Sequence, residues 1–273
     1  MTDQAQKAEL FVNLHRRDGV FLIPNPWDAG SARILEAQGI ESLATTSSGF
    51  AQTLGCHDGK VSPDEMFQHC AALCEATTIP ISADLENCYG DGPDEVAVCL
   101  SRFAESGIVG ASVEDYAPGS NARLYDFDHA VERVHAGVEA AAKLPFKFLL
   151  TARAENLLRG RNDIEDTIRR LQAFEAAGAD VLYAPGLTSL DDVRLVTQSV
   201  DRPVNVLGTF LHQHTIDEIG AAGAKRVSTG GGLARLVVGA LLAATHEMQS
   251  TGSQSWVANC AGFADVETAF SPD

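Results

Sequence analysis

Short apolar runs alternate with helical patterns along most of this chain. Eight of these runs are rich in apolar or β-branched residues and are predicted to be strands: residues 20–24, 42–46, 79–83, 109–113, 146–152, 180–183, 203–207 and 225–228. Their apolar character is continuous, which is typical of parallel strands that are covered on both faces. The stretches between them have the periodicity of amphipathic helices.

Four of the helical stretches end in a small-residue break that contains a glycine. These glycines are Gly39, Gly107, Gly178 and Gly223, and a strand-like run follows each one directly. Glycine just past a helix end adopts the left-handed conformation that other residues disfavour. The sequence therefore predicts four helix-to-strand transitions at these positions.

Eight alternations of strand and helix in about 250 residues predict an α/β fold of the (β/α)8 TIM-barrel type. The alternative is a doubly wound open sheet, which needs a glycine-rich phosphate turn after an early strand, and residues 25–30 fit that turn poorly. No linker-like segment divides the chain, so we predict one domain over residues 1–273. Residues 253–273 follow the barrel as a tail with an additional C-terminal helix.

The composition excludes several classes of partner. A net charge of −17 argues against binding to nucleic acid or to an anionic membrane surface. No signal peptide and no apolar run of about 18 residues is evident. The six cysteines form no CxxC pair and are predicted to be free thiols, which together with the missing signal predicts a cytoplasmic protein.

Carboxylates follow two of the predicted strands. Asp84 and Glu86 end the third run, two residues apart and so on one face if the strand continues, and Glu114 ends the fourth. Three carboxylates that converge from neighbouring strand ends predict a site for a hard cation, Mg²⁺ or Mn²⁺. The alternative is that each acid caps the helix that follows it.

Further polar residues follow other strands. Arg153 and Glu155 end the fifth run, where an arginine is either a fork for a substrate carboxylate or phosphate, or a structural salt bridge to a neighbouring acid. Hydroxyls and a glycine in residues 44–50 could offer donors to an anion. The loop of residues 54–59 carries His57 and Asp58.

Together these motifs resemble those of the isocitrate lyase/phosphoenolpyruvate mutase superfamily over roughly residues 18–250. The segments that carry the resemblance are Ser48-Gly49-Phe50, Gly55-Cys56-His57-Asp58, Ala83-Asp84-Leu85-Glu86, Ser112-Val113-Glu114-Asp115 and Thr151-Ala152-Arg153-Ala154-Glu155. Their order and spacing along eight β/α units make the resemblance specific. It implies a (β/α)8 barrel that binds Mg²⁺ and acts on small 2-oxo acids or their enolates.

The resemblance also implies roles for individual residues. Asp58, Asp84, Glu86 and Glu114 would surround the cation, several of them through water, while Ser48, Gly49 and Arg153 would hold the substrate carboxylate. We predict Asp58, His57 and Arg153 as catalytic residues. The predicted substrate-binding residues are Ser48, Gly49, Phe50, Arg153, Glu155 and Asn205.

The loop after the fourth strand departs from the family pattern. Isocitrate and methylisocitrate lyases carry a Lys-Lys-Cys-Gly-His type motif there, whereas residues 116–125 contain no cysteine, lysine or histidine. Tyr116 stands where the mutases have a lysine. We therefore expect an Mg²⁺-dependent lyase, decarboxylase or hydrolase acting on a small 2-oxo or 2-hydroxy (di)carboxylate through a metal-stabilised enolate. The alternatives are a non-catalytic 2-oxo acid binding protein and a phosphonate P–C bond enzyme.

Aromatic residues in the C-terminal tail predict an assembly. Trp256, Phe263 and Phe270 would be costly to expose in an acidic soluble protein, and such patches mark interfaces. Members of the resembling family form oligomers through their C-terminal helices. We expect a homo-oligomer, a dimer or tetramer, held partly by this tail; the alternative is a tail folded back on its own barrel.

Overall fold

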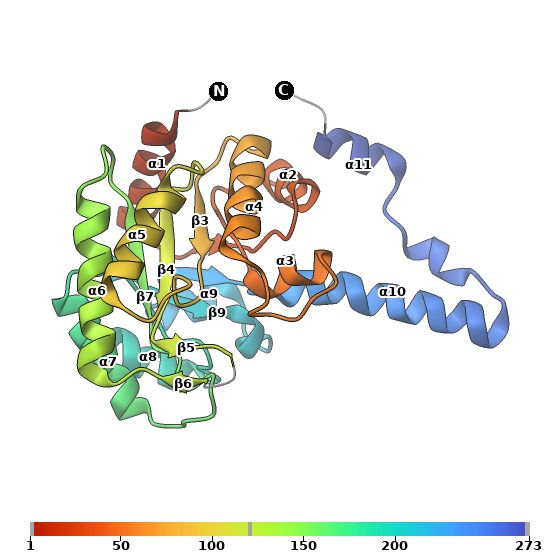
Figure 1. The fold of residues 1–273 in the computed structure, drawn as a ribbon. Coiled ribbons are helices and arrows are strands. Elements are labelled where there is room, and N and C mark those ends of the chain that lie inside the picture. Colours follow the sequence, from red (N-terminus) through yellow and green to blue (C-terminus); the bar gives the residue numbers. More distant parts are fainter. Residues whose placement is uncertain (1–2, 120–121, 271–273) are drawn as a thin grey trace.

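Eight parallel strands form a barrel that helices surround in the computed structural model, which describes residues 3–119 and 122–270 (Figure 1). The barrel strands are β1 (Phe21–Ile23), β2 (Leu43–Ala44), β3 (Ile81–Asp84), β4 (Gly110–Glu114), β7 (Leu149–Arg153), β8 (Val181–Tyr183), β9 (Val204–Leu207) and β10 (Arg226–Ser228). Each overlaps one of the eight predicted runs, so the predicted (β/α)8 TIM-type fold is confirmed.

The helices lie between the strands and continue beyond the last one. They are α1 (Gln4–Arg16), α2 (Ala29–Ala37), α3 (Ser47–Thr53), α4 (Pro63–Ala76), α5 (Pro93–Ala104), α6 (Phe127–Ala142), α7 (Ile164–Ala176), α8 (Leu190–Gln198), α9 (Ile216–Ala221), α10 (Gly232–Thr251) and α11 (Phe263–Phe270). Two 3-10 helices, η1 (Gly208–Leu211) and η2 (Ser255–Asn259), and an antiparallel pair, β5 (Tyr116–Ala117) and β6 (Arg123–Leu124), complete the elements.

A single backbone bond closes the barrel. The strand order is β1-β10-β9-β8-β7-β4-β3-β2, and the N–H of Ala44 in β2 donates to the carbonyl of Pro24, just after β1, at 3.1 Å. All the carboxyl ends of the strands therefore lie at one mouth, which is where barrel enzymes build their sites.

The glycines end the helices as predicted. Gly39, Gly107, Gly178 and Gly223 have φ angles of 83°, 99°, 103° and 102°, each just past a helix. At Gly223 a Cβ would lie 2.3 Å from Oγ1 of Thr197, so a side chain would also collide with α8.

The apolar core lies between the strands and the helices, not inside the barrel. Phe103, Phe148 and Phe174 are fully buried there. The barrel interior is instead lined largely by polar side chains that face one cavity. They are Ser82, Ser112, Arg153, Tyr183, Asn205, Arg226 and Ser228. Polar groups are costly to bury, so this interior is built for a purpose other than stability.

The C-terminal segment leaves the barrel and returns to it. Figure 1 shows α10 projecting away from the barrel, and α11 lying back near α2. The ring of Phe270 approaches Gly30 in α2, while Phe263 is 92% exposed. The tail thus contacts its own barrel, but much of its apolar surface remains uncovered, and its role in subunit contacts stays a prediction. No helix among the described residues is long and apolar enough to cross a membrane.

Candidate active site

A cavity of about 440 Å³ opens at the carboxyl ends of the strands. Six of the predicted site residues line it: Ser48, Asp58, Asp84, Glu114, Arg153 and Asn205. They come from separate β/α units, and the barrel brings them together because the ends of its parallel strands meet at one mouth.

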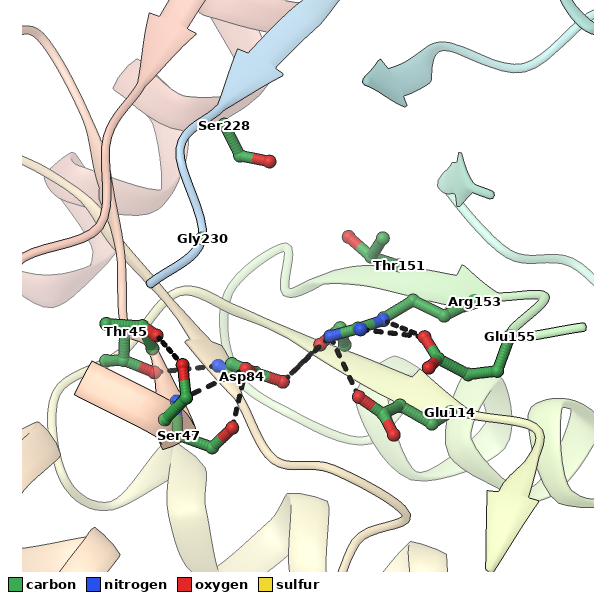
Figure 2. A network of polar contacts seen from close by, with 12 residues as sticks. Thr45, Ser47, Asp84, Glu114, Thr151, Arg153, Glu155, Ser228 and Gly230 are labelled. Carbon is green, nitrogen blue, oxygen red and sulfur yellow. Dashed lines mark hydrogen bonds and ion pairs between the residues drawn. The ribbon is translucent and has the colours of Figure 1, made fainter. Parts of the chain in front are cut away.

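Asp84 lies at the centre of a polar network at this mouth (Figure 2). It is the last residue of β3, and its backbone N–H donates to Oγ1 of Thr45 at 2.8 Å. The backbone N–H and the hydroxyl of Ser47, at the start of α3, donate to Oδ2 at 3.3 and 3.2 Å. The carboxylate is therefore held in one orientation by two neighbouring β/α units.

Arg153 joins three carboxylates across the mouth. Its Nη1 lies 3.0 Å from Oδ1 of Asp84 and 3.0 Å from Oε1 of Glu114, and its Nη2 lies 2.7 Å from Oε1 of Glu155 (Figure 2). The guanidinium carbon also lies 4.9 Å from the ring centre of Tyr183. Of the two roles considered for Arg153, the salt bridge to neighbouring acids is formed in this structure.

Glu155 lies behind Arg153 and does not face the cavity. It is fully buried, and its second oxygen accepts from Arg159, whose Nη2 lies 3.0 Å away. Its backbone N–H donates to Oδ1 of Asp115 at 2.7 Å, and Arg170 binds the other oxygen of Asp115 at 3.0 Å. Glu155 therefore supports Arg153 and Arg159 from below, and it is not in a position to contact a substrate directly.

The prediction that Glu86 shares a strand face with Asp84 is wrong. Strand β3 ends at Asp84, and the chain then turns, with Glu86, Cys88 and Tyr89 all at left-handed φ angles of 52° to 59°. The turn places Glu86 on a neighbouring cavity of about 390 Å³.

The carboxyl group of Glu86 is buried without a full set of partners. Its Oε1 meets no hydrogen-bond donor among the described residues. Burial, together with the charges of Asp84 and Asp58, raises its pKa to about 7. Such a carboxyl group is either protonated or needs a nearby positive charge to stabilise its ionised form.

Burial also raises the pKa values of Glu114 and Asp58. It raises the pKa of Glu114 well above its usual value, although the charge of Arg153 opposes this. The pKa of Asp58, at the solvent-exposed rim, is raised by its partial burial and then by the charge of Asp84. The mouth therefore concentrates more negative charge than its arginines neutralise.

The remaining predicted residues lie at different distances from the cavity. Gly49 packs behind it, where a Cβ would lie 3.2 Å from Trp27 and 3.3 Å from Ala234, so only glycine allows this contact. Phe50 stacks on His69 at 3.9 Å between ring centres, outside the cavity. His57 is exposed on its loop and does not line the cavity, so its predicted catalytic role has no support from its position.

Comparisons with known proteins agree with this geometry. The phosphoenolpyruvate phosphomutase family matches residues 11–249. An uncharacterized protein of Mycobacterium tuberculosis is 31% identical over 221 residues, which cover 81% of each chain. The chain belongs to the PEP mutase/isocitrate lyase superfamily.

Two further relatives extend this result. An oxaloacetate decarboxylase of Paraburkholderia xenovorans is 28% identical, over 74% of this chain and 69% of its own. A crystal structure from Burkholderia cenocepacia, assigned provisionally to the lyases or mutases, is 48% identical, has a TM-score of 0.95 and covers 98% of this chain and 97% of its own. The protein is thus an enzyme of the carbon–carbon lyase type found in the superfamily, whose members act on small carboxylates.

Superfamily members use Mg²⁺, and the residues of this chain suit that ion. The acids at the mouth supply only oxygen ligands, and the described residues contain no group of three or more His, Cys, Asp or Glu that could hold a metal alone. Mg²⁺ keeps several of its waters and needs few direct protein ligands. The unpartnered Oε1 of Glu86 and the excess of acids fit a cation held partly through water.

Several residues of the site escaped sequence reasoning. They are Arg159, Tyr183, Arg226 and Arg235, and all line the cavity. A signal was present for two of them: Tyr183 ends a predicted strand, and Arg159 follows Glu155 by four residues. Cys56 and Cys88, the two thiols nearest the mouth in sequence, do not line the cavity.

Proposed function

We propose that the protein is an Mg²⁺-dependent enzyme that cleaves a carbon–carbon bond in a small 2-oxo or 2-hydroxy (di)carboxylate. The observation that carries this proposal is the convergence of Asp58, Asp84 and Glu114 with Arg153 and Ser48 on one cavity at the barrel mouth. The carbon–carbon bond is favoured by the similarity to an oxaloacetate decarboxylase.

The residues of the mouth divide into those that hold the cation and those that hold the substrate. Asp84 would bind the cation, with Asp58, Glu86 and Glu114 around it. When bound, Mg²⁺ supplies Lewis-acid stabilisation for the negative charge that develops on the substrate oxygen. The chain's own part is to keep Asp84 and Glu114 oriented through Arg153 before the substrate arrives, which is electrostatic preorganisation.

Hydroxyl and amide groups would position the substrate. Ser48 lies at the rim, where its hydroxyl approaches Oγ1 of Thr46 at 3.2 Å, and it would donate to a substrate carboxylate. Asn205 donates one N–H of its amide to Oγ of Ser228 at 3.0 Å, which leaves a second N–H for a ligand. Asn205 comes from β9, across the barrel from the strand that carries Asp84, whereas Ser48 follows β2, the neighbour of that strand.

Phosphonate chemistry is the less favoured alternative. Tyr116 occupies the position at which the mutases carry a lysine, and its ring lies 3.8 Å from the guanidinium carbon of Arg159. This stacked pair replaces a flexible amine by a fixed aromatic group beside the acids. A screen that includes phosphonopyruvate with oxaloacetate and related acids separates the two chemistries.

The test of the function removes Asp84. In Asp84→Ala we expect Mg²⁺-dependent ligand binding to be lost, because the remaining acids cannot replace the central ligand, while the fold persists. Calorimetry with Mg²⁺ and oxalate measures this. The control Asp191→Ala changes an exposed acid on α8 and should bind as the wild type does. Unchanged Mg²⁺ and oxalate affinity in Asp84→Ala would contradict the assignment of Asp84 as the central cation ligand.

We further propose that the protein assembles with copies of itself through α10. Only Ala234 is buried along this 20-residue helix, whereas Leu236, Leu241 and Leu242 are 68%, 64% and 66% exposed. A helix with such a face needs a partner surface, and the described residues of its own barrel do not cover it. A second copy of this chain is the proposed partner, because the tail that follows α10 exposes a further large apolar side chain, Phe263.

Light scattering tests this assembly. The wild type should be an oligomer at micromolar concentration, and Leu241→Glu should shift it towards the monomer. The control Val98→Glu changes an equally exposed apolar residue, 69% accessible, on α5 and should leave the mass unchanged. A monomeric wild type would contradict the proposed assembly.

We also propose that the protein works in the cytoplasm. The free cysteines and the absence of a membrane-spanning helix among the described residues support this proposal.

A further inference from the structure

Arg226 lies inside the barrel, below the acids of the mouth. It is the first residue of β10, two residues deeper than Ser228, and it is only 4% exposed while lining the cavity. Its Nη2 donates to Oγ1 of Thr151 in β7 at 2.9 Å. Strands β10 and β7 are not neighbours in the barrel, so the side chain crosses the interior and forms part of the cavity floor.

The hydrogen-bond partners of this guanidinium within the described part of the chain are all neutral. Besides Thr151, Nε donates to Oδ1 of Asn205 at 2.9 Å, and Nη1 lies 3.3 Å from Nε2 of His15. Nδ1 of His15 lies 2.8 Å from the carbonyl of Phe11, so Nδ1 carries the proton and Nε2 accepts from Arg226. Burial, followed by the charge of Arg226, lowers the pKa of His15 to about 3, which keeps this acceptor uncharged.

The positive charge of Arg226 therefore has no carboxylate counter-ion among the described residues. No carboxylate of residues 3–119 or 122–270 forms an ion pair with it, and burial lowers its pKa to about 10. A guanidinium has five N–H groups, and three of them are used by the neutral acceptors. Buried charges are costly unless they are paired, so the floor combines an uncompensated cation with free donors.

The other arginines of the cavity differ in this respect. Arg153 contacts three carboxylates, and Arg159 contacts Glu114 and Glu155. Arg235, in the first turn of α10, is exposed at the rim, where solvent screens its charge. Among the cavity arginines, Arg226 alone is both buried and without a carboxylate partner within the described ranges.

We propose that Arg226 binds a second carboxylate of the substrate, so that the site selects dicarboxylates over monocarboxylates. This inference rests on the proposed function, because it assumes that the first carboxylate is held at the mouth. A carboxylate on the floor would accept the free N–H groups of Arg226 and would neutralise its charge. Asn205, which Arg226 holds through Oδ1, keeps its second N–H for the same ligand.

A pair of matched ligands tests the assignment. Malate and 2-hydroxybutyrate differ only in a terminal carboxylate that replaces a methyl group. Calorimetry in the presence of Mg²⁺ should show that Arg226→Gln weakens malate binding by about tenfold or more, as expected for a lost charge-assisted bond, and leaves 2-hydroxybutyrate unchanged. Arg226→Lys keeps a charge and should show an intermediate loss of malate affinity.

Two controls separate binding from a purely structural brace. Thr151→Val removes one of the neutral partners without touching the charge, and Thr151 does not line the cavity, so malate affinity should persist. Arg235→Gln should have a smaller effect on malate than Arg226→Gln. The reverse order would move the second carboxylate to the rim and overturn the proposal.

The remaining outcomes are equally decisive. Equal losses for both ligands in Arg226→Gln, or a lower melting temperature with unchanged affinities, would show that Arg226 only braces the barrel. If the wild type binds neither ligand with Mg²⁺, the proposed function itself fails. In that case, malonate without metal tests anion binding by Arg226 independently. Malonate should raise the melting temperature of the wild type but not that of Arg226→Gln.

Discussion

Arg153 and Arg226 lie in the same barrel, both are buried, and their surroundings are opposite. Arg153 at the mouth contacts Asp84, Glu114 and Glu155, so one positive charge meets three carboxylates. Arg226 on the floor meets an amide, a hydroxyl and an imidazole. The mouth thus has an excess of negative charge and the floor an excess of positive charge.

This difference indicates which counter-charge the mouth and the floor each lack. An excess of carboxylates is relieved by a cation, and superfamily members use Mg²⁺. An unpaired guanidinium is relieved by an anion, which is what a carboxylate substrate brings. A substrate that reaches from the mouth to the floor, bound together with a cation, would compensate the excess charge of both. Neither the mouth nor the floor is arranged for maximal stability of the free protein.

The largest expected effect comes from deleting each arginine in turn. Arg153→Met leaves Asp84 without a basic partner and leaves Glu114 and Glu155 with Arg159 alone, so it should lower the free energy of unfolding by about 3–5 kcal/mol, as for other broken buried pairs. Arg226→Met leaves only neutral acceptors and removes an uncompensated charge, so its cost should stay below about 2 kcal/mol. Urea unfolding in the presence of EDTA measures both.

Added Mg²⁺ sharpens this comparison. The cation should restore part of the stability of Arg153→Met, because it can neutralise the exposed excess of acids, and it should do little for Arg226→Met. Equal costs for the two deletions, with equal responses to Mg²⁺, would remove the distinction between mouth and floor.

The sequence predicted the mouth better than the floor. Asp84, Glu114 and Arg153 each end an apolar strand, and the ends of parallel strands must meet at one mouth once the barrel is recognised. Arg226 is the first residue of its strand and follows Lys225 directly. Two adjacent basic residues at the start of a strand suggest, from the sequence alone, that both are exposed to solvent. Its place inside the barrel depends on its register opposite Asn205 and Phe21, which only the closed structure fixes.

The errors at the mouth also have physical causes. The position of Glu86 was predicted by extending the strand beyond Asp84. The chain instead turns there through residues with left-handed φ angles, and none of them is a glycine that would mark the turn in the sequence. Glu155 follows the last residue of β7 by two and turns inward beneath Arg153 to bind Arg159. His57 lies in a loop, where sequence spacing does not determine the direction of a side chain.

Acid pH should affect the floor through His15. Its folded pKa of about 3 lies below the usual value of 6.5, so the stability that it contributes is present above about pH 6.5 and is lost as the pH falls. Between pH 7 and pH 4 we expect a loss of about 3 kcal/mol, because a protonated His15 would be a buried charge and would also face Arg226. His15→Gln keeps a donor for Phe11 and an acceptor for Arg226, and should flatten this part of the pH profile of urea unfolding. An unchanged slope in that variant would contradict the assignment of this loss to His15.

The mouth should respond to pH in the opposite direction, with a smaller amplitude. The folded pKa of Glu86, about 7, lies above its usual 4.5, so its contribution is complete below about pH 4.5 and is lost as the pH rises through 7. Without metal, raising the pH from 5.5 to 7 should cost about 2 kcal/mol, since Arg153 and Arg159 offset part of the penalty. Glu86→Gln should remove this loss, whereas Glu132→Gln, at an exposed position, should keep it. Saturating Mg²⁺ should also remove it in the wild type, because a cation beside the carboxylate favours its charged form. A loss that persists in Glu86→Gln would place the excess negative charge elsewhere in the barrel.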